Sequence, residues 1–238
     1  MIIAATGDIH SPRYFELFVK AIEGLHVELT RPDLFLLAGD IIQSGNVKEY
    51  YRVYNALFGK VTCPIVACFG NDEYEQNWSI IKEQNPDIKF LNDESIVIEI
   101  DGKSVGIVGT KGSLDRPTWW QKNNIPGIWD KYRERVVIVE KLLSELKTDV
   151  KILLIHYVPT YKILEGEKPI SYPELGSNAY EKVLIEQKPD LSITGHSHRG
   201  KKQVWIDTVP VFNVALPLNE KIVVVDTENL KPGLEKFF

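Results

Sequence analysis

The chain has 238 residues, 44% of them hydrophobic and 26% charged, a composition typical of a globular protein with a sizeable core. Its 28 basic and 33 acidic residues give a formal charge of −5, which excludes a broadly basic nucleic-acid-binding coat. The start of the chain lacks a basic segment before its short apolar run, and no run of about 20 apolar residues occurs. We therefore expect a soluble, cytoplasmic protein without membrane contact, folded as one domain over residues 1–238.

Strands and helices are predicted to alternate along the first third of the chain. Continuous apolar runs at residues 2–6, 34–38 and 65–69 predict buried strands. Apolar side chains at helical spacing follow the first two runs, and Ser11 and Pro12 are predicted as the N-cap and first residue of the first helix. This alternation predicts a mainly parallel α/β sheet with helices on both faces.

The remainder of the chain adds antiparallel strands. Residues 95–100 and 105–108 flank Asp101-Gly102, a turn dipeptide that predicts a hairpin. We expect helices capped by Asp130 and Ser177, and strands at residues 150–155, 191–194, 203–206, 209–213 and 221–225. Two stretches, 111–129 and 159–176, are predicted to be irregular, and loops of this length often bind ligands.

The two cysteines are predicted to be structural. Cys63 and Cys68 are five residues apart on a predicted strand, so their side chains would point to opposite faces. That spacing excludes a disulfide between them and a metal site built from cysteine alone.

Polar residues follow five of the predicted strands within one or two positions: Asp8, Asp40, Asn71, His156 and His196. Because the carboxyl ends of parallel strands meet at one sheet edge, these side chains are predicted to converge. His10 and His198 lie two residues beyond Asp8 and His196 and add two imidazoles. A lone histidine at a strand end is more often structural, but four of the five histidines fall here, and His26, without such a motif, is predicted to be structural.

This set of donors suits a dinuclear metal site. It offers two Asp, one Asn and four His but no thiolate, which favours two divalent ions, with Mn expected first and Fe, Zn or Ni as alternatives. If Asp40 bridges, each ion can receive four protein ligands. Two cations about 3.5–4 Å apart would lower the pKa of a bridging water and hold phosphoryl oxygens for in-line displacement by the resulting hydroxide.

The motifs Asp8-x-His10, Gly39-Asp40, Gly70-Asn71, His156 and Gly195-His196-x-His198 occur in this order. The series resembles the calcineurin-like metallophosphoesterase superfamily over nearly the whole chain. The resemblance implies one metal bound by Asp8, His10 and His198, a second bound by Asn71, His156 and His196, and Asp40 as the bridge. It also implies an α/β (α+β) four-layer αββα sandwich of two mixed β-sheets flanked by helices, in place of one doubly wound sheet.

Two departures from the family pattern narrow the expected substrate. Many members have His after the Asn of the third motif, whereas this chain has Asp72, which we expect either to act as a general acid or to hydrogen-bond to a metal ligand. The hypothesis that follows is a preference for phosphodiesters or for esters with stabilised leaving groups. The Arg that follows Gly-Asp in serine/threonine protein phosphatases is absent after Asp40, so a phosphoprotein is not expected, and small phosphoesters, cyclic nucleotides, nucleotide derivatives and nucleic-acid ends stay open. Nucleic acid is disfavoured because the chain has neither spare length nor a basic, aromatic-interleaved stripe for an added DNA-binding region.

Candidate substrate-binding residues lie on the irregular stretches and beside the histidines. Arg116, Trp119 and Trp120 could supply a cation and a stacking surface for a nucleobase or another flat group, or the tryptophans could cover the core or a subunit contact. Arg13 and Arg199 are candidates for binding phosphate, with solvated arginines as the alternative.

Two other functions are compatible with these motifs. One is a non-catalytic scaffold of the same fold, as occurs in the retromer complex, with the tryptophan-rich loop as its partner surface. The other is hydrolysis of a different bond by the same metals. Neither the physiological substrate nor the oligomeric state follows from the sequence.

Overall fold

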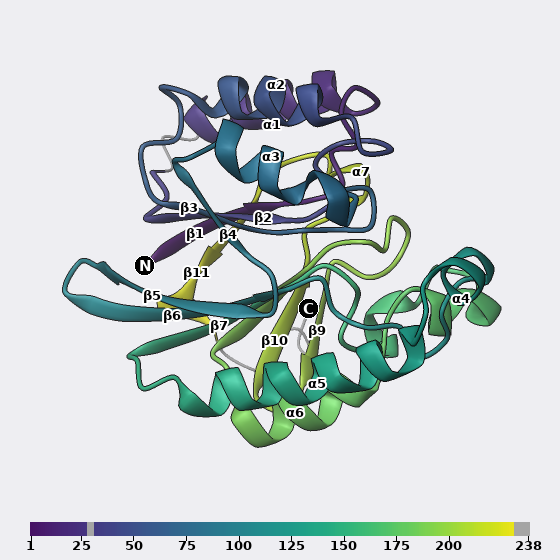
Figure 1. The fold of residues 1–238 in the computed structure, drawn as a ribbon. Coiled ribbons are helices and arrows are strands. Elements are labelled where there is room, and N and C mark those ends of the chain that lie inside the picture. The colour runs from purple at the N-terminus through teal and green to yellow at the C-terminus, as the bar shows by residue number, and fades with distance from the viewer. Residues whose placement is uncertain (28–30, 231–238) are drawn as a thin grey trace.

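Two β-sheets pack face to face between two layers of helices in the computed structural model, which describes residues 1–27 and 31–230 (Figure 1). The strands are β1 Ile2–Thr6, β2 Leu34–Ala38, β3 Ile65–Cys68, β4 Ile88–Leu91, β5 Glu94–Ile100, β6 Lys103–Thr110, β7 Val150–Ile155, β8 Leu191–Thr194, β9 Gln203–Ile206, β10 Val209–Asn213 and β11 Val223–Asp226. The α-helices are α1 Phe15–Val27, α2 Val47–Leu57, α3 Trp78–Gln84, α4 Trp119–Asn124, α5 Ile128–Glu145, α6 Ala179–Gln187 and α7 Leu216–Asn219. Four 3₁₀ helices are η1 Glu75–Asn77, η2 Tyr161–Leu164, η3 Pro169–Glu174 and η4 Thr227–Asn229.

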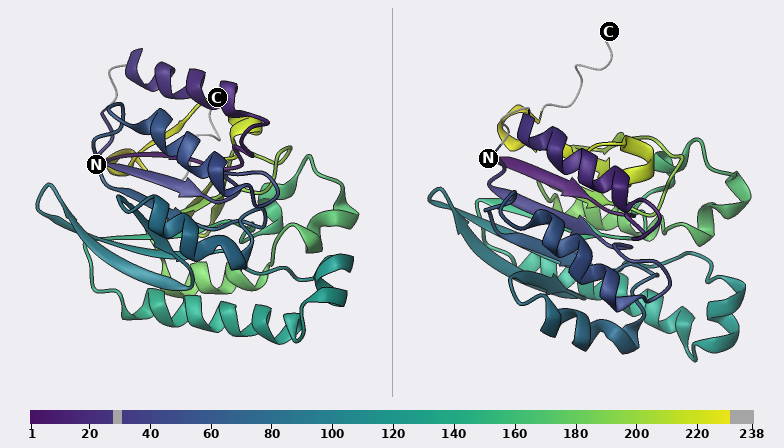
Figure 2. Two further views of the ribbon diagram at one scale, coloured as in Figure 1. Left: turned by 45° about the horizontal axis from the view of Figure 1, so that its top comes forward. Right: turned by 90° about the horizontal axis from the view of Figure 1, so that it is seen from above.

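Both sheets are mixed. The first has the order β11-β1-β2-β3-β4, in which β1 to β4 are parallel and β11 runs antiparallel beside β1. The second has the order β5-β6-β7-β8-β10-β9, with the antiparallel strands β5 and β9 at its edges. Helices α1, α2 and α3 cover the outer face of the first sheet, and α5 and α6 cover that of the second (Figure 2). The four-layer αββα sandwich is therefore confirmed.

The single doubly wound sheet that the alternation of strands and helices suggests is wrong, and the burial of β2 explains why. Phe35 and Leu37 pack into the cluster under the helices, whereas Leu34 and Leu36 pack into the cluster between the two sheets. A strand between a helix layer and a second sheet is buried on both faces, as is a strand between two helix layers. A continuous apolar run does not distinguish these two environments.

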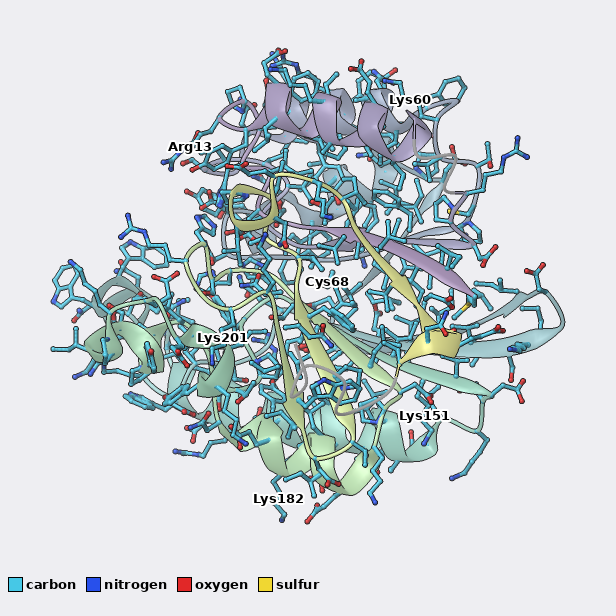
Figure 3. All side chains as sticks on the ribbon, turned by 180° about the vertical axis from the view of Figure 1, so that it is seen from behind. Arg13, Lys60, Cys68, Lys151, Lys182 and Lys201 are labelled. Atoms are coloured by element: carbon cyan, nitrogen blue, oxygen red, sulfur yellow. The ribbon has the colours of Figure 1, made fainter. Side chains whose placement is uncertain are left out.

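The cysteines are free thiols, as predicted, but they do not share a strand. Cys68 is the last residue of β3 and lies in the interior, while the labelled Lys60 and Lys182 lie at the periphery (Figure 3). Cys63 precedes β3 and packs, partly buried, against the cluster under the helices. The His26 side chain falls outside the described part of the chain, so its structural role stays a prediction.

Several predicted helix starts are displaced. Helix α1 begins at Phe15 rather than Pro12, because the Ser11 N–H donates to the Ile41 carbonyl and its hydroxyl donates to Glu49. Asp130 lies in the first turn of α5, which begins after Gly127 in a left-handed conformation at φ 69°. Asn178, not Ser177, precedes α6, although the Ser177 hydroxyl accepts from the Ala179 N–H at 3.2 Å.

The stretch 111–129 is not wholly irregular, because it contains helix α4 and the start of α5. The Thr118 hydroxyl accepts from the Gln121 N–H, and the Gln121 side chain accepts from the Thr118 N–H. This reciprocal pair is a capping box, which the sequence Thr-x-x-Gln indicates. The stretch 159–176 likewise contains η2 and η3. Within residues 1–27 and 31–230, no helix combines the length and apolar composition needed to cross a bilayer.

Truncation of Leu36 tests the packing between the sheets. Leu36→Ala should lower the free energy of unfolding by about 2–5 kcal/mol, because this fully buried side chain leaves a cavity between two rigid layers. Urea denaturation measures the change. Val137→Ala, at a side chain 63% exposed, is the matched control and should change stability by no more than about 0.5 kcal/mol. Equal effects of the two substitutions would contradict the assignment of this core.

Candidate metal centre

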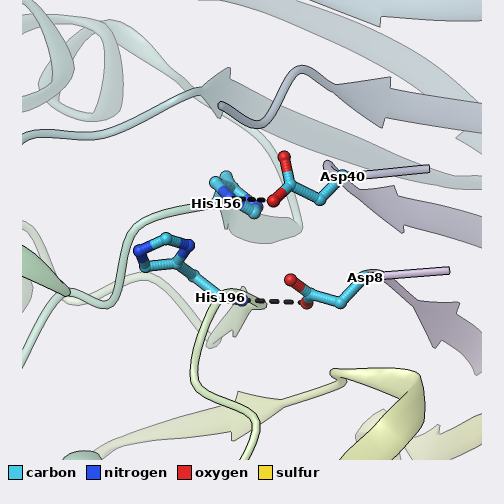
Figure 4. Close-up of side chains that lie close together, drawn as sticks. All are labelled: Asp8, Asp40, His156 and His196. Carbon is cyan, nitrogen blue, oxygen red and sulfur yellow. Dashed lines mark hydrogen bonds and ion pairs between the residues drawn. The ribbon is translucent and has the colours of Figure 1, made fainter. Parts of the chain in front are cut away.

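All seven predicted ligands come together at the carboxyl edge of the two sheets. Asp8 and Asp40 follow β1 and β2 of the first sheet, and His156 and His196 follow β7 and β8 of the second, so that carboxylates and imidazoles face one another across the edge (Figure 4). Potential ligand atoms form three groups: the first has Asp8, Asp40, His156 and His196, the second Asp8, His10 and His198, and the third His10, Asp40 and Asp72. Asn71 joins the first group through its Oδ1, 3.2 Å from His156 Nε2.

The imidazole nitrogens and carboxylate oxygens of the predicted ligands lie 3.2–3.8 Å apart, close enough to share one cation. His198 Nε2 lies 3.2 Å and His10 Nε2 3.8 Å from Asp8 Oδ1. Asp40 Oδ2 lies 3.7 Å from His10 Nε2 and 3.5 Å from His156 Nε2, between the first two groups. This intermediate position is the one that a bridging carboxylate would occupy.

The tautomer of His156 is set by its hydrogen bond to the main chain, and it leaves a group of acceptor atoms that suits a cation. His156 Nδ1 lies 2.8 Å from the Ala38 carbonyl oxygen, which can only accept, so Nδ1 carries a proton. In the neutral ring Nε2 is then an acceptor, yet it faces the oxygens of Asp40 and Asn71. Acceptors converging on one point need a cation or an additional proton between them. The residues present therefore fit divalent metal ions.

Close backbone approach explains the glycines before the ligands. A Cβ on Gly70 would lie 2.1 Å from Asp40 Oδ1, and one on Gly195 would lie 2.5 Å from Asp8 Oδ2. Four of the ligand residues adopt left-handed backbone conformations: Asp8 at φ 55°, His10 at 42°, Asp40 at 52° and His196 at 69°. Such conformations are unfavourable outside glycine and cluster at functional sites.

Glu73, which the sequence reasoning missed, organises this edge. Its buried carboxylate accepts four backbone hydrogen bonds, from Asp40 at 2.8 Å, Ile41 at 2.7 Å, Ile42 at 3.1 Å and Gly70 at 2.7 Å. Burial, followed by the nearby Asp40 carboxylate, raises the pKa of Glu73 to about 7, although the N–H donors oppose this rise. The sequence feature that could have identified Glu73 is an acidic residue three positions after Gly70, the glycine of the Gly70-Asn71 motif.

The electrostatics of the ligands reflect burial and mutual contact. Burial would raise the pKa of Asp40, but His156, His10 and His196 together outweigh burial and hold the pKa well below its usual range. Burial likewise would lower the pKa of His156, but Asp40, Asp8 and the Ala38 carbonyl together outweigh burial and raise the pKa to about 9. Burial lowers the pKa of His196 to about 4, and the neighbouring His156 acts in the same direction. His196 is thus a neutral imidazole near neutral pH, the form that binds metal.

Asp72 lies beside His10, one of the predicted metal ligands. Its Oδ2 is 3.0 Å from His10 Nδ1, and its backbone N–H donates to Asp40 Oδ1 at 2.7 Å. A carboxylate in this position fixes the ring orientation of His10 and leaves Nε2 directed at the carboxylates of Asp8 and Asp40.

A pocket of about 740 Å³ opens beside the ligands. Its lining residues are Asn71, Tyr74, Glu75, Gln76, Lys111, Leu114, Thr118, Trp120, Gln121, Ile125, Tyr157, Glu174 and His196. Trp120 is the one predicted substrate-binding residue among them, and the other four lie elsewhere. Trp119 is 78% exposed, Arg116 pairs with Glu174 at 3.0 Å, Arg13 lies over the Tyr14 ring, and Arg199 is exposed. Substrate contact by these four stays a prediction.

The chain belongs to the calcineurin-like phosphoesterase family, whose model matches residues 1–200. A curated relative from Arcobacter nitrofigilis, named "Probable glycerophosphodiester phosphodiesterase GpdQ", is 24% identical over 191 residues. The match covers 80% of this chain and 65% of that relative, so the chain spans just under two thirds of its length.

Solved structures share the fold at low identity. The protein TT1561 of Thermus thermophilus is 16% identical with a TM-score of 0.60, and the match covers 95% of this chain and 98% of that one. GAP50, the anchor in the inner membrane complex of Plasmodium, is 15% identical with a TM-score of 0.59, and the match covers 91% and 72%.

Gly70→Ala tests the close approach at the proposed bridge. The new methyl would collide with Asp40 Oδ1, so metal content measured after purification should fall by more than half and the melting temperature should drop. Gly24→Ala, within α1 and with no atom within 4 Å of the new Cβ, is the control and should stabilise the protein by about 0.5–1 kcal/mol. Full metal content in Gly70→Ala would disprove the constraint.

Proposed function

We propose that this protein hydrolyses phosphodiesters or other small phosphate esters with two divalent metal ions, Mn being the first candidate. The observation that carries the proposal is the convergence of seven ligand-competent side chains at one sheet edge, beside a pocket large enough for an organic group. We assign one metal to Asp8, His10 and His198 and the second to Asn71, His156 and His196, with Asp40 between them.

Some residues of the chain would bind the metal ions, and others would hold the side chains of those ligands in orientation. When bound, two divalent cations supply an activated water and neutralise charge on the phosphoryl group. The Ala38 carbonyl fixes the tautomer of His156, and Asp72 orients His10, so that both rings keep Nε2 toward the carboxylates. The backbone N–H of His196 donates to Asp8 Oδ2 at 2.8 Å and holds that carboxylate in place.

The pocket is proposed to receive the ester's organic group. Trp120, 58% exposed, supplies a stacking face at its rim, and Leu114 and Tyr157 supply buried apolar surface. Aromatic and apolar walls with a few polar groups are typical of small-molecule sites. A diester is favoured over a monoester because this pocket leaves room for a substituent on the phosphate, and the curated relative bears a phosphodiesterase name.

The activity is tested with bis-p-nitrophenyl phosphate after removal of metal by a chelator. Chelation should abolish turnover and added Mn²⁺ should restore it. Asp40→Asn should lower kcat by at least about 100-fold, because the shared carboxylate charge is lost. Asp207→Asn, in the exposed turn between β9 and β10, serves as the control and should retain full activity.

The same measurement decides between the enzyme and the scaffold. A protein with less than about one metal ion per chain and no turnover on any ester would favour a scaffold and overturn the proposal. The exposed Trp119, Trp120 and Ile170 would then be the first surface to examine for a partner.

Asp72 is proposed to act by positioning His10 rather than as a general acid. Asp72→Asn should therefore lower kcat by about 10- to 100-fold on nitrophenyl and alkyl esters alike, and it should weaken metal affinity. Rates on both ester types, together with metal titration, provide the test. A loss confined to alkyl esters, with unchanged metal affinity, would instead assign the acid role, because only a basic leaving group needs the proton.

A further inference from the structure

Lys111 is the residue that follows β6, at the same edge as the proposed ligands. Five of the proposed ligands follow β1, β2, β3, β7 and β8: Asp8, Asp40, Asn71, His156 and His196. Strand β6 is the parallel neighbour of β7. The Tyr157 N–H donates to the Lys111 carbonyl at 3.0 Å, one step beyond the bond from the His156 N–H to the Thr110 carbonyl. The Lys111 backbone is therefore fixed directly beside the strand end that carries His156.

The ammonium group of Lys111 has an aromatic neighbour and, within the described part of the chain, no ion-pair partner. Its Nζ lies 5.8 Å from the centre of the Trp78 ring, and that ring stacks on Phe69 at 4.5 Å. Trp78 is held further by its Nε1–H, which donates to the Glu73 carbonyl at 2.8 Å. Across residues 1–27 and 31–230, no carboxylate oxygen lies within 4.0 Å of Lys111 Nζ. Burial of the side chain lowers the pKa of Lys111, against an opposing pull from Glu75.

A partly buried cation without a counter-ion is costly unless a ligand supplies the charge. Lys111 lines the 740 Å³ pocket together with Asn71 and His196, two of the proposed metal ligands. Of the two carboxylates that line the pocket, Glu174 is already paired with Arg116, and the exposed Glu75 attracts Lys111 electrostatically but has no oxygen within 4.0 Å of its Nζ. Among the described residues, Lys111 is therefore a cation of the pocket wall without a close ion pair.

We propose that Lys111 binds an anionic oxygen of the substrate and so takes the place of the arginines that the sequence offered as phosphate-binding candidates. This assignment rests on the proposed function, since it places the anion in the pocket shared with the proposed metal ligands. The anionic oxygen belongs either to the reacting phosphoryl group or to a second acidic substituent on the organic group. Both sources share the chemistry of an oxyanion accepting from an ammonium.

Equilibrium binding to the Mn²⁺-loaded protein tests this without requiring turnover. Lys111→Met should weaken binding of inorganic phosphate, measured by calorimetry, about 10- to 100-fold, the range for loss of a charge-assisted hydrogen bond. Lys111→Arg should restore part of the affinity. Lys122→Met, at an exposed lysine on α4 outside the pocket, is the matched control and should bind phosphate as the native protein does.

A second probe, phosphonoacetate, distinguishes the two sources. Weaker binding of both probes by Lys111→Met would assign the reacting phosphoryl group, and weaker binding of phosphonoacetate alone would assign a second acidic substituent. Unchanged affinity for both would overturn the proposal, as would a loss of bound metal in Lys111→Met, which would give the lysine a structural role. Weaker phosphate binding in a protein that hydrolyses no ester would keep Lys111 as an anion site while refuting the proposed function.

Discussion

Four backbone N–H groups converge on the Glu73 carboxylate, and the geometry of the candidate metal edge depends on them. Three come from the loop after β2 and one from the loop after β3, so a single side chain fastens two strand ends together. Unpaired, these buried donors would each cost about 1–3 kcal/mol, which makes the loop conformations highly specific. The left-handed backbone of Asp40 persists because these hydrogen bonds hold it.

The convergence of the proposed ligands could be predicted from the sequence because one rule governs their positions. A polar residue just after a buried parallel strand lies at the carboxyl edge, whatever the rest of the fold. The same rule identifies Lys111 once β6 is extended to Thr110, two residues beyond the predicted end at Val108. The rule does not identify Glu73, because Glu73 is the fifth residue after β3 and its carboxylate accepts hydrogen bonds from main-chain N–H groups such as that of Gly70.

The number of sheets could not be predicted from periodicity, because central strands of both sheets, such as β2 and β8, are buried on both faces. Helix starts were displaced where tertiary hydrogen bonds compete with local caps, as at Ser11, whose N–H and hydroxyl bond to the loop after β2 and to α2. In contrast, the hairpin of β5 and β6 was predictable, because Asp101-Gly102 specifies the turn locally and β5 has one solvent-exposed face.

Helix α4 and the metal edge are connected through Tyr157. The Gln121 side chain, whose oxygen caps α4, donates through Nε2 to the Tyr157 hydroxyl at 3.3 Å, and Tyr157 is covalently next to His156. The Tyr157 ring also lies 4.8 Å from that of His196. The pocket wall and the two imidazoles of His156 and His196 therefore contact the same buried aromatic side chain. By thermodynamic linkage, any effect of an occupied pocket on metal affinity would be matched by an equal effect of bound metal on pocket affinity.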